Sequence, residues 1–322
     1  MKGVRIHSFG GPDVLTYEDL PEPSPRADEA VVNVDAAGVN FIDTYHRTGA
    51  YKNPLPFTLG QEGAGTVTAA GPDAAGVKVG DRVAWTGVSG SYAERVAVPA
   101  ARLIALPPGM TTRHGAALLL QGLTAHYLAC STYPLKPGDT CLVHAGAGGV
   151  GLLLTQIAKL RGARVITTVS TSEKAALSRA AGAHDVVVYT RQDFEGEVKR
   201  ITGGRGVQVV YDSVGKTTFD KSLNCLAPRG LLALFGQSSG AVPPVDPQLL
   251  SQKGSLFLTR PTLVHYIATP SELRERAQDL FAWIAAGTLR LRIEFEFPLK
   301  DAAEAHRALE SRQTTGKVLL IP

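Results

Sequence analysis

A glycine-rich segment carries the clearest chemical signal in the sequence, because the pattern GxGxxG occurs at Gly146, Gly148 and Gly151. Glycines allow the backbone to turn tightly and approach a pyrophosphate, and a helix that begins there offers free N–H groups to the anion. The motif follows an apolar strand pattern over 140–144 and precedes a helix pattern over 152–160. This order predicts a dinucleotide-binding loop, whereas the same glycines outside such a context would form a plain turn.

The residues after the second strand pattern, 164–169, predict which dinucleotide is bound. Folds that prefer NAD usually place an Asp or Glu at this strand end to bind the ribose 2′-hydroxyl. Here the position holds Ser170 and Thr171, with Lys174 one helical step later. Hydroxyls and a cation suit a 2′-phosphate, so NADPH is favoured, and Tyr189 after the third strand is expected on the same side. Glu173 could be offered as the missing acid, but it lies past the strand end, where an acid in the first turn of a helix is common. Lys174 could also be an ordinary surface lysine.

The elements that must position this loop form an alternation of strands and helices. Six strand patterns are expected at 140–144, 164–169, 185–188, 207–212, 231–235 and 255–259, with helix patterns between the first five. Such alternation predicts an α/β fold with right-handed crossovers, and six parallel strands make up the full doubly wound Rossmann domain. The first hundred residues instead show short strand patterns at 30–36, 65–70, 82–85 and 92–98, separated by Gly- and Pro-rich turns. They predict a second, mostly β domain.

The last fifty residues do not fit into a finished Rossmann sheet. Helix patterns over 273–284 and 302–309 and a strand pattern over 317–321 follow the sixth strand. We therefore expect this tail to return to the N-terminal β domain.

Composition places the chain among globular proteins of ordinary kind. Its 322 residues are 44% hydrophobic and 19% charged, and with a net charge of +4 its acidic and basic residues are interspersed. No apolar run reaches the ~18 residues of a membrane span, and the first residues read as a strand rather than a signal peptide, so we expect a cytoplasmic protein. Cys130, Cys141 and Cys225 are too widely spaced for a disulfide framework or a thiolate-rich metal site.

Further segments complete a family pattern that runs nearly from end to end. They are AGVNFIDTY at 37–45, LGQEGAG at 59–65, GLTA at 122–125, HAGAGGVG at 144–151, FGQSS at 235–239 and LTRP at 258–261. Together they resemble the NADPH:quinone oxidoreductases, the zeta-crystallin group of the medium-chain dehydrogenase/reductase superfamily. The resemblance implies a GroES-like catalytic domain formed by 1–122 with 264–322, an NADPH-binding Rossmann domain formed by 123–263, and an active cleft between them. It also implies a homodimer built through the Rossmann domains.

The resemblance raises the question of zinc, which alcohol-dehydrogenase relatives hold with an early Cys, the His of a GHE motif and a later Cys or carboxylate. Here the loop for the first ligand begins at Asn40, and the triplet reads GQE at 60–62. An amide is a poor zinc ligand beside imidazole or thiolate. His126 and His144 fit a helix and a strand better than a ligand set. We therefore expect no metal.

Without a metal to activate an alcohol, the expected reaction is reduction of an acceptor that is already electrophilic. A quinone or similar conjugated carbonyl accepts hydride from the nicotinamide and takes its proton from water or a weak acid, so the protein mainly supplies positioning and exclusion of water. The resemblance puts Asn40, Tyr45 and Tyr51 at the nicotinamide mouth as substrate-positioning residues, with no obligatory acid or base. Each tyrosine could instead be a half-buried aromatic of the β domain, and Asn40 a loop residue in a left-handed conformation.

The cofactor-binding residues expected from the motif, the strand ends and the resemblance extend over both domains. They are Asn40, Thr124, Tyr127, Gly146, Gly148, Gly149, Val150, Gly151, Ser170, Thr171, Lys174, Tyr189, Ser213, Phe235, Gly236, Ser238, Thr259 and Arg260. Within this set, Arg260 could also pin the two domains together, and Thr124 and Tyr127 could face the core.

Two other functions stay open. An enoyl-thioester or alkenal reductase of the same superfamily is the nearest alternative, although it would need a basic entrance that the N-terminal sequence does not show. A different class is an RNA-binding or structural, crystallin-like role, but no RNA-reading motif is present. We expect a small quinone as substrate and a second copy of the chain as partner, and neither a membrane nor a nucleic acid.

Overall fold

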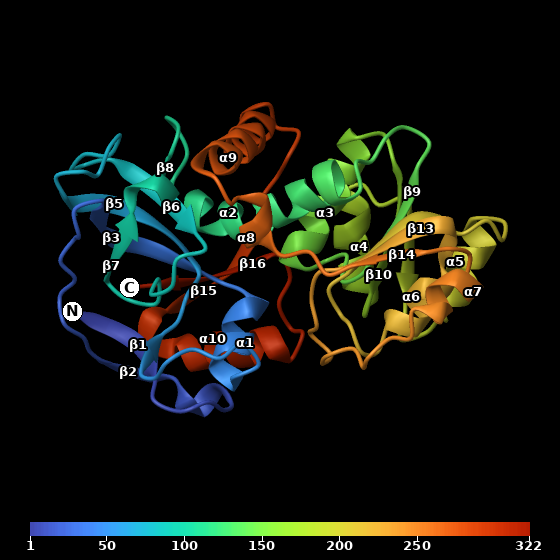
Figure 1. Cartoon of the computed structure of the whole chain (residues 1–322), viewed down its shortest axis with the longest axis horizontal. Helices are drawn as coiled ribbons and strands as arrows, with labels where there is room; N and C mark the ends of the chain where they lie inside the picture. The colour runs from blue at the N-terminus through green and yellow to red at the C-terminus, as the bar shows by residue number, and fades with distance from the viewer. The chain divides into compact units, whose positions relative to one another are not determined.

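The computed structural model describes residues 1 to 322, and the chain forms two compact units (Figure 1). The first unit consists of Met1–Gln121, Ile267–Phe281 and Leu291–Pro322, and the second of Gly122–Tyr266 and Ala282–Arg290. Residues 282–290, which the resemblance assigned to the catalytic domain, thus group with the second unit.

Largely antiparallel sheets make up the first unit. One has the order β2-β1-β4, and a seven-stranded sheet has the order β15-β16-β3-β5-β6-β8, with β7 paired to β3. Strand β3 is central, because β16, β5 and β7 all pair with it and most of its side chains are buried. The strands are β1 (Lys2–Ile6), β2 (Thr16–Asp19), β3 (Glu29–Val39), β4 (Phe57–Thr58), β5 (Glu62–Ala70), β6 (Arg82–Thr86), β7 (Arg95–Pro99), β8 (Ile104–Ala105), β15 (Ile293–Pro298) and β16 (Lys317–Ile321).

Some of these strands differ from the sequence expectation. The pattern at 92–98 yields a strand only from Arg95 onward, and β2, β4 and β8 are too short to show a periodicity. Strand β15 was not expected, although Ile293, Phe295 and Phe297 alternate with glutamates or proline in the period of two that predicts a strand.

Helix α1 (Phe41–Thr48) begins where the sequence suggested a loop. Its N-cap, Asn40, has a φ of −139°, so the left-handed conformation considered for this residue is wrong. The Asn40 N–H donates to the Asp43 carboxylate at 2.8 Å, and Gly49 ends the helix with a φ of 79°. Asn at the N-cap, Asp three residues later and Gly at the end are signals of a helix, so this short element could have been predicted.

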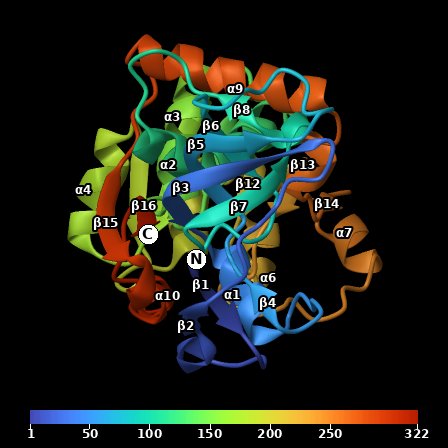
Figure 2. The same cartoon turned by 90° about the vertical axis from the view of Figure 1, so that its left-hand side faces the viewer.

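The C-terminal tail returns to the first unit, as expected. Strand β16 pairs antiparallel with β3 and places Leu319 opposite Gly38 and Val318 opposite Val39. In Figures 1 and 2 the red C-terminal segments of this unit, β16 and helix α10 (Ala302–Glu310), lie beside its blue N-terminal strands. Lys317, the first residue of β16, is thereby brought next to the segment that leads into α1.

The second unit is a parallel sheet with the order β11-β10-β9-β12-β13-β14. Counted along the chain, this is the order 3-2-1-4-5-6 of the doubly wound dinucleotide-binding fold. All six expected strands are present, although β13 begins earlier than expected and β14 later, because Ser255 has a left-handed φ of 57°. The strands are β9 (Thr140–Val143), β10 (Arg164–Val169), β11 (Asp185–Val188), β12 (Val207–Asp212), β13 (Leu226–Leu234) and β14 (Phe257–Thr259).

The helices have modest lengths throughout. The longest, α2 and α9, have 16 residues each, and none has the length and apolar composition required to span a membrane. A π-helical turn over Leu128–Thr132 continues α2. The helices not yet given are α2 (Thr112–Tyr127), α3 (Gly149–Leu160), α4 (Ser172–Ala180), α5 (Phe194–Ile201), α6 (Phe219–Asn224), α7 (Gln248–Gln252), α8 (Leu263–Tyr266) and α9 (Pro270–Ala285).

A chain of polar side chains, buried except at Glu310, connects α10 to α1 within the first unit. Arg47 forms a two-bond ion pair with Glu310 at 2.7 and 3.0 Å, and its Nη1 also lies 3.0 Å from Nδ1 of His306. A guanidinium can only donate, so His306 carries its proton on Nε2, which lies 3.1 Å from the Tyr92 hydroxyl. Tyr92 in turn donates to the Asp43 carboxylate at 3.1 Å. Each hydrogen bond in this chain therefore has a fixed direction.

Burial shifts the pKa values of two titratable members of this chain, His306 and Asp43, in opposite directions. Loss of hydration, with the nearby Arg47 charge, lowers the pKa of His306 to about 3. Loss of hydration raises the pKa of the Asp43 carboxyl to about 7, although its hydrogen bonds to the Asn40 N–H and Tyr92 favour the charged form. One oxygen of this carboxylate, Oδ1, has no hydrogen-bond partner, which adds to the cost of its charge.

We predict that these shifts oppose each other in the pH dependence of stability. Between pH 3 and 6.5 the unfolded chain holds more protons on His306, so the free energy of unfolding rises with pH. Between pH 3.8 and 7 the folded chain holds more on Asp43, so that free energy falls with pH. His306→Gln should therefore give a profile that falls from pH 4 to 6.5, and Asp43→Asn one that rises, each by up to ~1.4 kcal/mol per pH unit relative to wild type.

Urea unfolding between pH 4 and 7 would measure these profiles. His114→Gln, at an exposed imidazole of α2, is the control and should follow the wild-type profile. Parallel profiles for the wild type, His306→Gln and Asp43→Asn would contradict the prediction, whatever the absolute stabilities.

Candidate active site

The glycine loop joins β9 to α3 in the second unit. Gly148 is the N-cap of α3, and no side chain caps the first turn, which leaves its N–H groups for an anion. A Cβ at Gly146 would lie 2.6 Å from the Cβ of Thr167, and a Cβ at Gly151 would overlap the carbonyl oxygen of Ala145. Only glycine fits these two positions, and the open helix end they create fits a dinucleotide pyrophosphate.

The ring of His144, at the end of β9, is held by hydroxyl groups of β10 and α6. Its Nδ1 lies 2.8 Å from the Thr168 hydroxyl and its Nε2 lies 3.0 Å from the Ser222 hydroxyl. Ser222 donates to Asp212, so it accepts from Nε2–H, and Nδ1 accepts from Thr168. Burial lowers the pKa of His144, which keeps the ring neutral.

The expected 2′-phosphate residues lie at the neighbouring ends of β10 and β11. The Tyr189 N–H donates to Val169 O at 3.0 Å, and its side chain is 39% exposed. Thr171 is the N-cap of α4 and accepts from the N–H of Lys174 at 3.2 Å. The structure thus brings Ser170, Thr171, Lys174 and Tyr189 together at the edge of the sheet formed by the carboxyl ends of its strands.

Arg191 is a cation at this edge that the sequence reading missed. Its positive charge contributes to the lowered pKa of Glu173, behind the larger effects of the first-turn N–H and the Thr171 hydroxyl. Glu173 is fully exposed and sits in the first turn of α4, as expected for an acidic residue at a helix start.

Further strand ends gather at the same edge of the sheet. Ser238 N–H donates to Ser213 O at 3.2 Å, and a Cβ at Gly236 would lie 2.5 Å from that oxygen, so these residues are in close contact. Arg260, which follows Thr259 at the end of β14, donates to Leu234 O at 3.0 Å within this unit. A cavity of ≈ 250 Å³ lies here, lined among others by Phe219, Gln237, Leu258 and Arg260. Phe235 comes directly before Gly236, which lines this cavity, and its N–H donates to Asp212 O at 2.8 Å.

Two expected residues on α2 are buried. Thr124 is 7% exposed, and Tyr127 is 2% exposed and stacks on Tyr266 with ring centroids 4.2 Å apart. Burial raises the pKa of the Tyr127 hydroxyl. The structure therefore places Tyr127 in a packed aromatic pair of the second unit.

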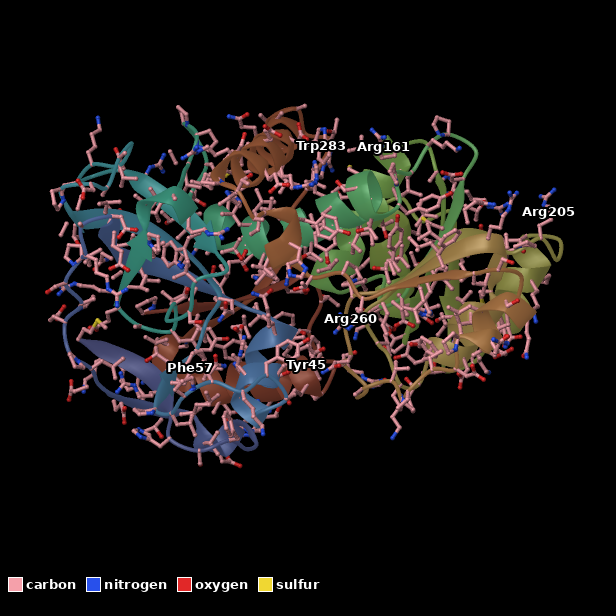
Figure 3. All side chains as sticks on the ribbon, in the orientation of Figure 1. Tyr45, Phe57, Arg161, Arg205, Arg260 and Trp283 are labelled. Carbon is pink, nitrogen blue, oxygen red and sulfur yellow. The ribbon has the colours of Figure 1, made fainter.

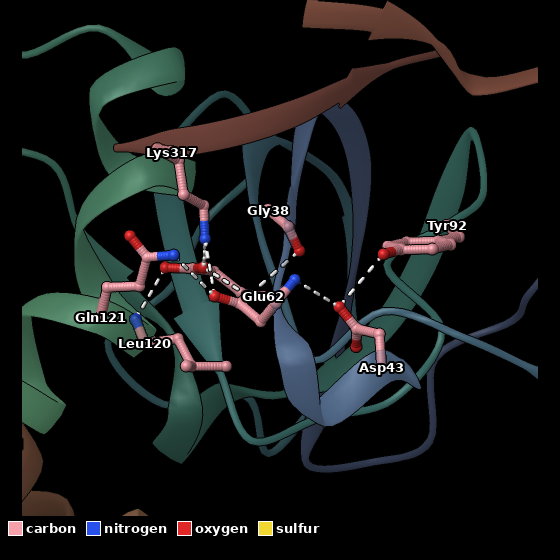
Figure 4. A network of polar contacts seen from close by, with 8 residues as sticks. Gly38, Asp43, Glu62, Tyr92, Leu120, Gln121 and Lys317 are labelled. Atoms are coloured by element: carbon pink, nitrogen blue, oxygen red, sulfur yellow. Dashed lines mark hydrogen bonds and ion pairs between the residues drawn. The ribbon is translucent and has the colours of Figure 1, made fainter. Parts of the chain in front are cut away.

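In the first unit, Asn40 is the centre of a buried polar network. Figure 4 labels its partners Gly38, Glu62, Gln121 and Lys317. Its amide nitrogen donates to Gly38 O at 3.2 Å and to Glu62 Oε2 at 3.0 Å. Its amide oxygen accepts from Gln121 Nε2 at 3.1 Å and from Lys317 Nζ at 3.0 Å. An asparagine amide has two donors and two acceptor sites, so all four are in use.

A buried ion pair completes this network. The Lys317 ammonium is 2% exposed and contacts the Glu62 carboxylate, which is fully buried. Glu62 also accepts from the Leu120 N–H at 2.6 Å. A Cβ at Gly38 would meet Glu62, and it would lie 2.6 Å from both Lys317 Nζ and Ala116 O, so the network leaves room only for glycine there.

Lys317 and Gln121 are therefore members of the candidate site that the sequence reading did not single out. A lysine that opens an apolar strand reads as a solvent-exposed end, and only the pairing of β16 with β3 buries it. Glu62 belongs to the LGQEGAG segment at 59–65, but that segment does not indicate which residues contact its side chain.

The expected acceptor residues form an aromatic cluster around the end of α1. Tyr45 and Tyr51 pack edge to face with ring centroids 5.3 Å apart, and His46 contacts Tyr51 and Phe57. Asn53 donates to Nδ1 of His46 at 2.6 Å, and partial burial lowers the pKa of this histidine. Tyr45 and Phe57 are labelled in Figure 3 on the first unit, and Tyr51 is 37% exposed.

The residues at the positions of a zinc site do not fit a metal. Asn40 has no free amide lone pair, and the side chain of Gln61 donates to the Ser89 hydroxyl at 2.6 Å. No group of three or more His, Cys, Asp or Glu side chains in the chain is placed to hold a metal ion. Burial raises the pKa of the Cys141 and Cys225 thiols to about 12, which disfavours the thiolate that binds metals.

Comparisons with known proteins agree with this architecture. Residues 26–108 match the model of the alcohol dehydrogenase GroES-like domain, and residues 181–320 match the model of the zinc-binding dehydrogenases. A quinone oxidoreductase of Pseudomonas aeruginosa is 47% identical over 100% of this chain and 99% of its own. A 2-haloacrylate reductase of a Burkholderia species is 43% identical over 98% of each chain.

A solved structure extends the likeness to the whole backbone. The Escherichia coli quinone oxidoreductase, solved in complex with NADPH, superimposes with a TM-score of 0.98 at 44% identity and covers 100% of both chains. Identity at this level over the full length, together with the Rossmann sheet and the GroES-like unit, establishes the relationship. The chain belongs to the quinone oxidoreductase family of the medium-chain dehydrogenase/reductase superfamily.

Proposed function

We propose that this protein is an NADPH-dependent reductase of quinones that works without zinc. The observation that carries the proposal is that protein groups, including the Lys317 ammonium, occupy the hydrogen-bonding atoms of Asn40 and Glu62, which stand at positions of a zinc site. The dinucleotide loop of the same chain is intact. The named quinone oxidoreductases at 45–47% identity support the same assignment.

NADPH, when bound, supplies a hydride to an electrophilic acceptor. The residues of the loop from Gly146 to Gly151 would hold the pyrophosphate with backbone N–H groups, because no side chain caps the N-terminus of α3. Ser170, Lys174 and Tyr189 would hold the 2′-phosphate, with Arg191 as a further cation. Ser213, Gly236 and Thr259, at the carboxyl ends of the later strands, would line the nicotinamide half.

Preference for NADPH over NADH should depend on Lys174. A hydrogen bond to a charged group contributes ~1.5–3 kcal/mol, so Lys174→Ala should weaken NADPH binding roughly tenfold to a hundredfold. NADH binding should barely change because NADH lacks the phosphate, and Arg191→Ala should act in the same direction. Quenching of protein fluorescence by each nucleotide would give the dissociation constants.

Lys199→Ala is the matched control for this prediction. Lys199 lies on α5, is half exposed and pairs with Glu195, so its replacement should leave the dissociation constants of both nucleotides unchanged. Equal losses of NADPH and NADH affinity in Lys174→Ala would mean that Lys174 serves the fold of α4 and not the phosphate.

Tyr45 and Tyr51 are proposed to shape the acceptor site and not to deliver a proton. Their edge-to-face packing and the partial exposure of Tyr51 form an aromatic surface on which a planar acceptor can stack. A quinone needs little polarisation to accept hydride, so Tyr45→Phe and Tyr51→Phe should keep most of kcat and change mainly KM. Steady-state kinetics with a small benzoquinone would measure both constants.

A reductase of conjugated alkenes is the second candidate, favoured by the 43% identity to a 2-haloacrylate reductase. Reduction of such a double bond requires a proton at carbon. If Tyr45 or Tyr51 delivered that proton, its replacement by Phe would lower kcat about a thousandfold with little change in KM. NADPH oxidation with quinones, a 2-haloacrylate and an enoyl thioester would separate the two. Brisk turnover of an alkene beside inactivity with every quinone would refute the quinone assignment.

The purified protein should contain no stoichiometric metal. The amides of Asn40 and Gln61 are engaged by protein groups and are weak zinc ligands in any case. Elemental analysis should find less than about one tenth of a zinc ion per chain, and a strong chelator should leave activity unchanged. One tightly held zinc per chain with chelator-sensitive activity would overturn this part of the proposal.

A homodimer and a cytoplasmic location complete the proposal. Strand β14 is an edge strand of the Rossmann sheet and its Phe257 is 60% exposed, which suits pairing with a second copy. Cys130, Cys141 and Cys225 form no disulfide bond, which suits a reducing compartment.

A further inference from the structure

We propose that Lys317 is a positioning residue for acceptor reduction, because its buried ammonium acts as an internal cation that neutralises Glu62 and fixes the side chain of Asn40. This inference rests on the proposed function, since Asn40 is expected beside the nicotinamide and its acceptor. It assigns a role to the last strand of the chain, which contains none of the motifs that indicated the function.

The contacts of Lys317 are those of a cation site. Nζ donates to the amide oxygen of Asn40 at 3.0 Å and contacts the carboxylate of Glu62, and the side chain is 2% exposed (Figure 4). Among the partners of Glu62, which also accepts from Asn40 and the Leu120 N–H, only Lys317 carries a charge. The ammonium is therefore the only positive charge that compensates this fully buried carboxylate.

The same contacts fix the orientation of the Asn40 amide. Its oxygen faces an ammonium and its nitrogen faces a carboxylate, so a rotation of the amide by 180° would place like partners against each other. Its backbone N–H is fixed separately by Asp43. Because every polar atom of the Asn40 side chain is engaged, this residue presents a rigid shape to a ligand and offers it no hydrogen bond.

The network is also closed to a metal. A divalent cation between Asn40 and Glu62 would have to displace the Lys317 ammonium from both oxygens, and Gly38 marks how little space remains. Lys317 thus supplies, from within the chain, the positive charge that this pair of oxygen groups needs.

Three variants of the full-length protein separate the positioning role from a structural one. Lys317→Met keeps the volume and leaves Glu62 charged and unpaired. The double variant Glu62→Gln with Lys317→Met removes both charges, and Lys317→Ala leaves a space that methylammonium can enter. Lys300→Met, at an exposed lysine of the same unit, is the control. Thermal midpoint, NADPH dissociation constant, and kcat and KM for the best acceptor of the wild type are measured for each.

We expect Lys317→Met to unfold at a lower temperature and to lose about ten- to hundredfold in kcat, since a displaced positioning group costs rate. The double variant should regain most of the thermal midpoint but not kcat, because Asn40 still lacks its cation. Methylammonium should raise kcat of Lys317→Ala and leave Lys317→Met unaffected, where the space is filled. NADPH binding should change much less than kcat in all three, because the glycine loop and the residues proposed for the 2′-phosphate belong to the other unit.

Recovery of kcat together with stability in the double variant would show that Lys317 serves only the fold, and so would sink the proposal. Rescue of Lys317→Met by methylammonium, or wild-type kcat in Lys317→Met, would do the same. Hydrogen exchange of the peptide over 38–45 gives a readout independent of turnover: it should rise in the double variant and not in Lys300→Met. If the wild type reduced no quinone but these exchange results held, the proposed function would fail and the role of Lys317 in holding Asn40 would stand.

Discussion

A buried ammonium and a buried carboxylate, Lys317 and Glu62, meet in the first unit at a point where distant segments of the chain converge. Removing two such ions from water costs several kcal/mol each, and the cost is recovered only when the geometry is good and the remaining hydrogen-bonding sites are filled. Here they are filled by Asn40 and by the Leu120 N–H, and glycine at position 38 is required to admit the pair. The start of α1, the start of β5, the middle of α2 and the last strand are all tied to this one contact.

The dinucleotide loop of the second unit depends on a constraint of another kind. Its glycines are required by close backbone approaches, such as that of Gly151 to the carbonyl of Ala145, and not by any charge. The loop is held on one side by the packing of Gly146 against Thr167 and by the buried His144 behind it. No side chain caps the first turn of α3, so its N–H groups are open to an anion.

Asn40 is held at two points by networks of different character. Its amide belongs to the ion pair, while its backbone N–H is bound to Asp43, which ends the chain of hydrogen bonds from Glu310 through Arg47, His306 and Tyr92. Because the pKa shifts of Asp43 and His306 are opposite, their effects on the free energy of unfolding largely cancel over the pH range where both act. The position of Asn40 is thereby secured from the helix side and from the sheet side.

The sequence by itself determined the features whose residues are neighbours in the chain. The glycine motif lies within eight residues, and the strands of the Rossmann sheet are short apolar runs between helix patterns, so local periodicity and turn chemistry were enough to predict them. The signals of α1 and β15 were equally local, with a helix cap at Asn40 and an alternation at 293–297, and could have been used.

Only the tertiary structure decided what surrounds Asn40. Lys317 is 277 residues away from it and 255 from Glu62, and nothing in the pattern of an apolar terminal strand indicates that its first lysine is buried. That burial follows from the register of β16 against β3, in which Leu319 stands opposite Gly38. Register between distant strands is set by the packing of the whole sheet, because a periodicity of two tells which face a residue occupies but not which partner it meets.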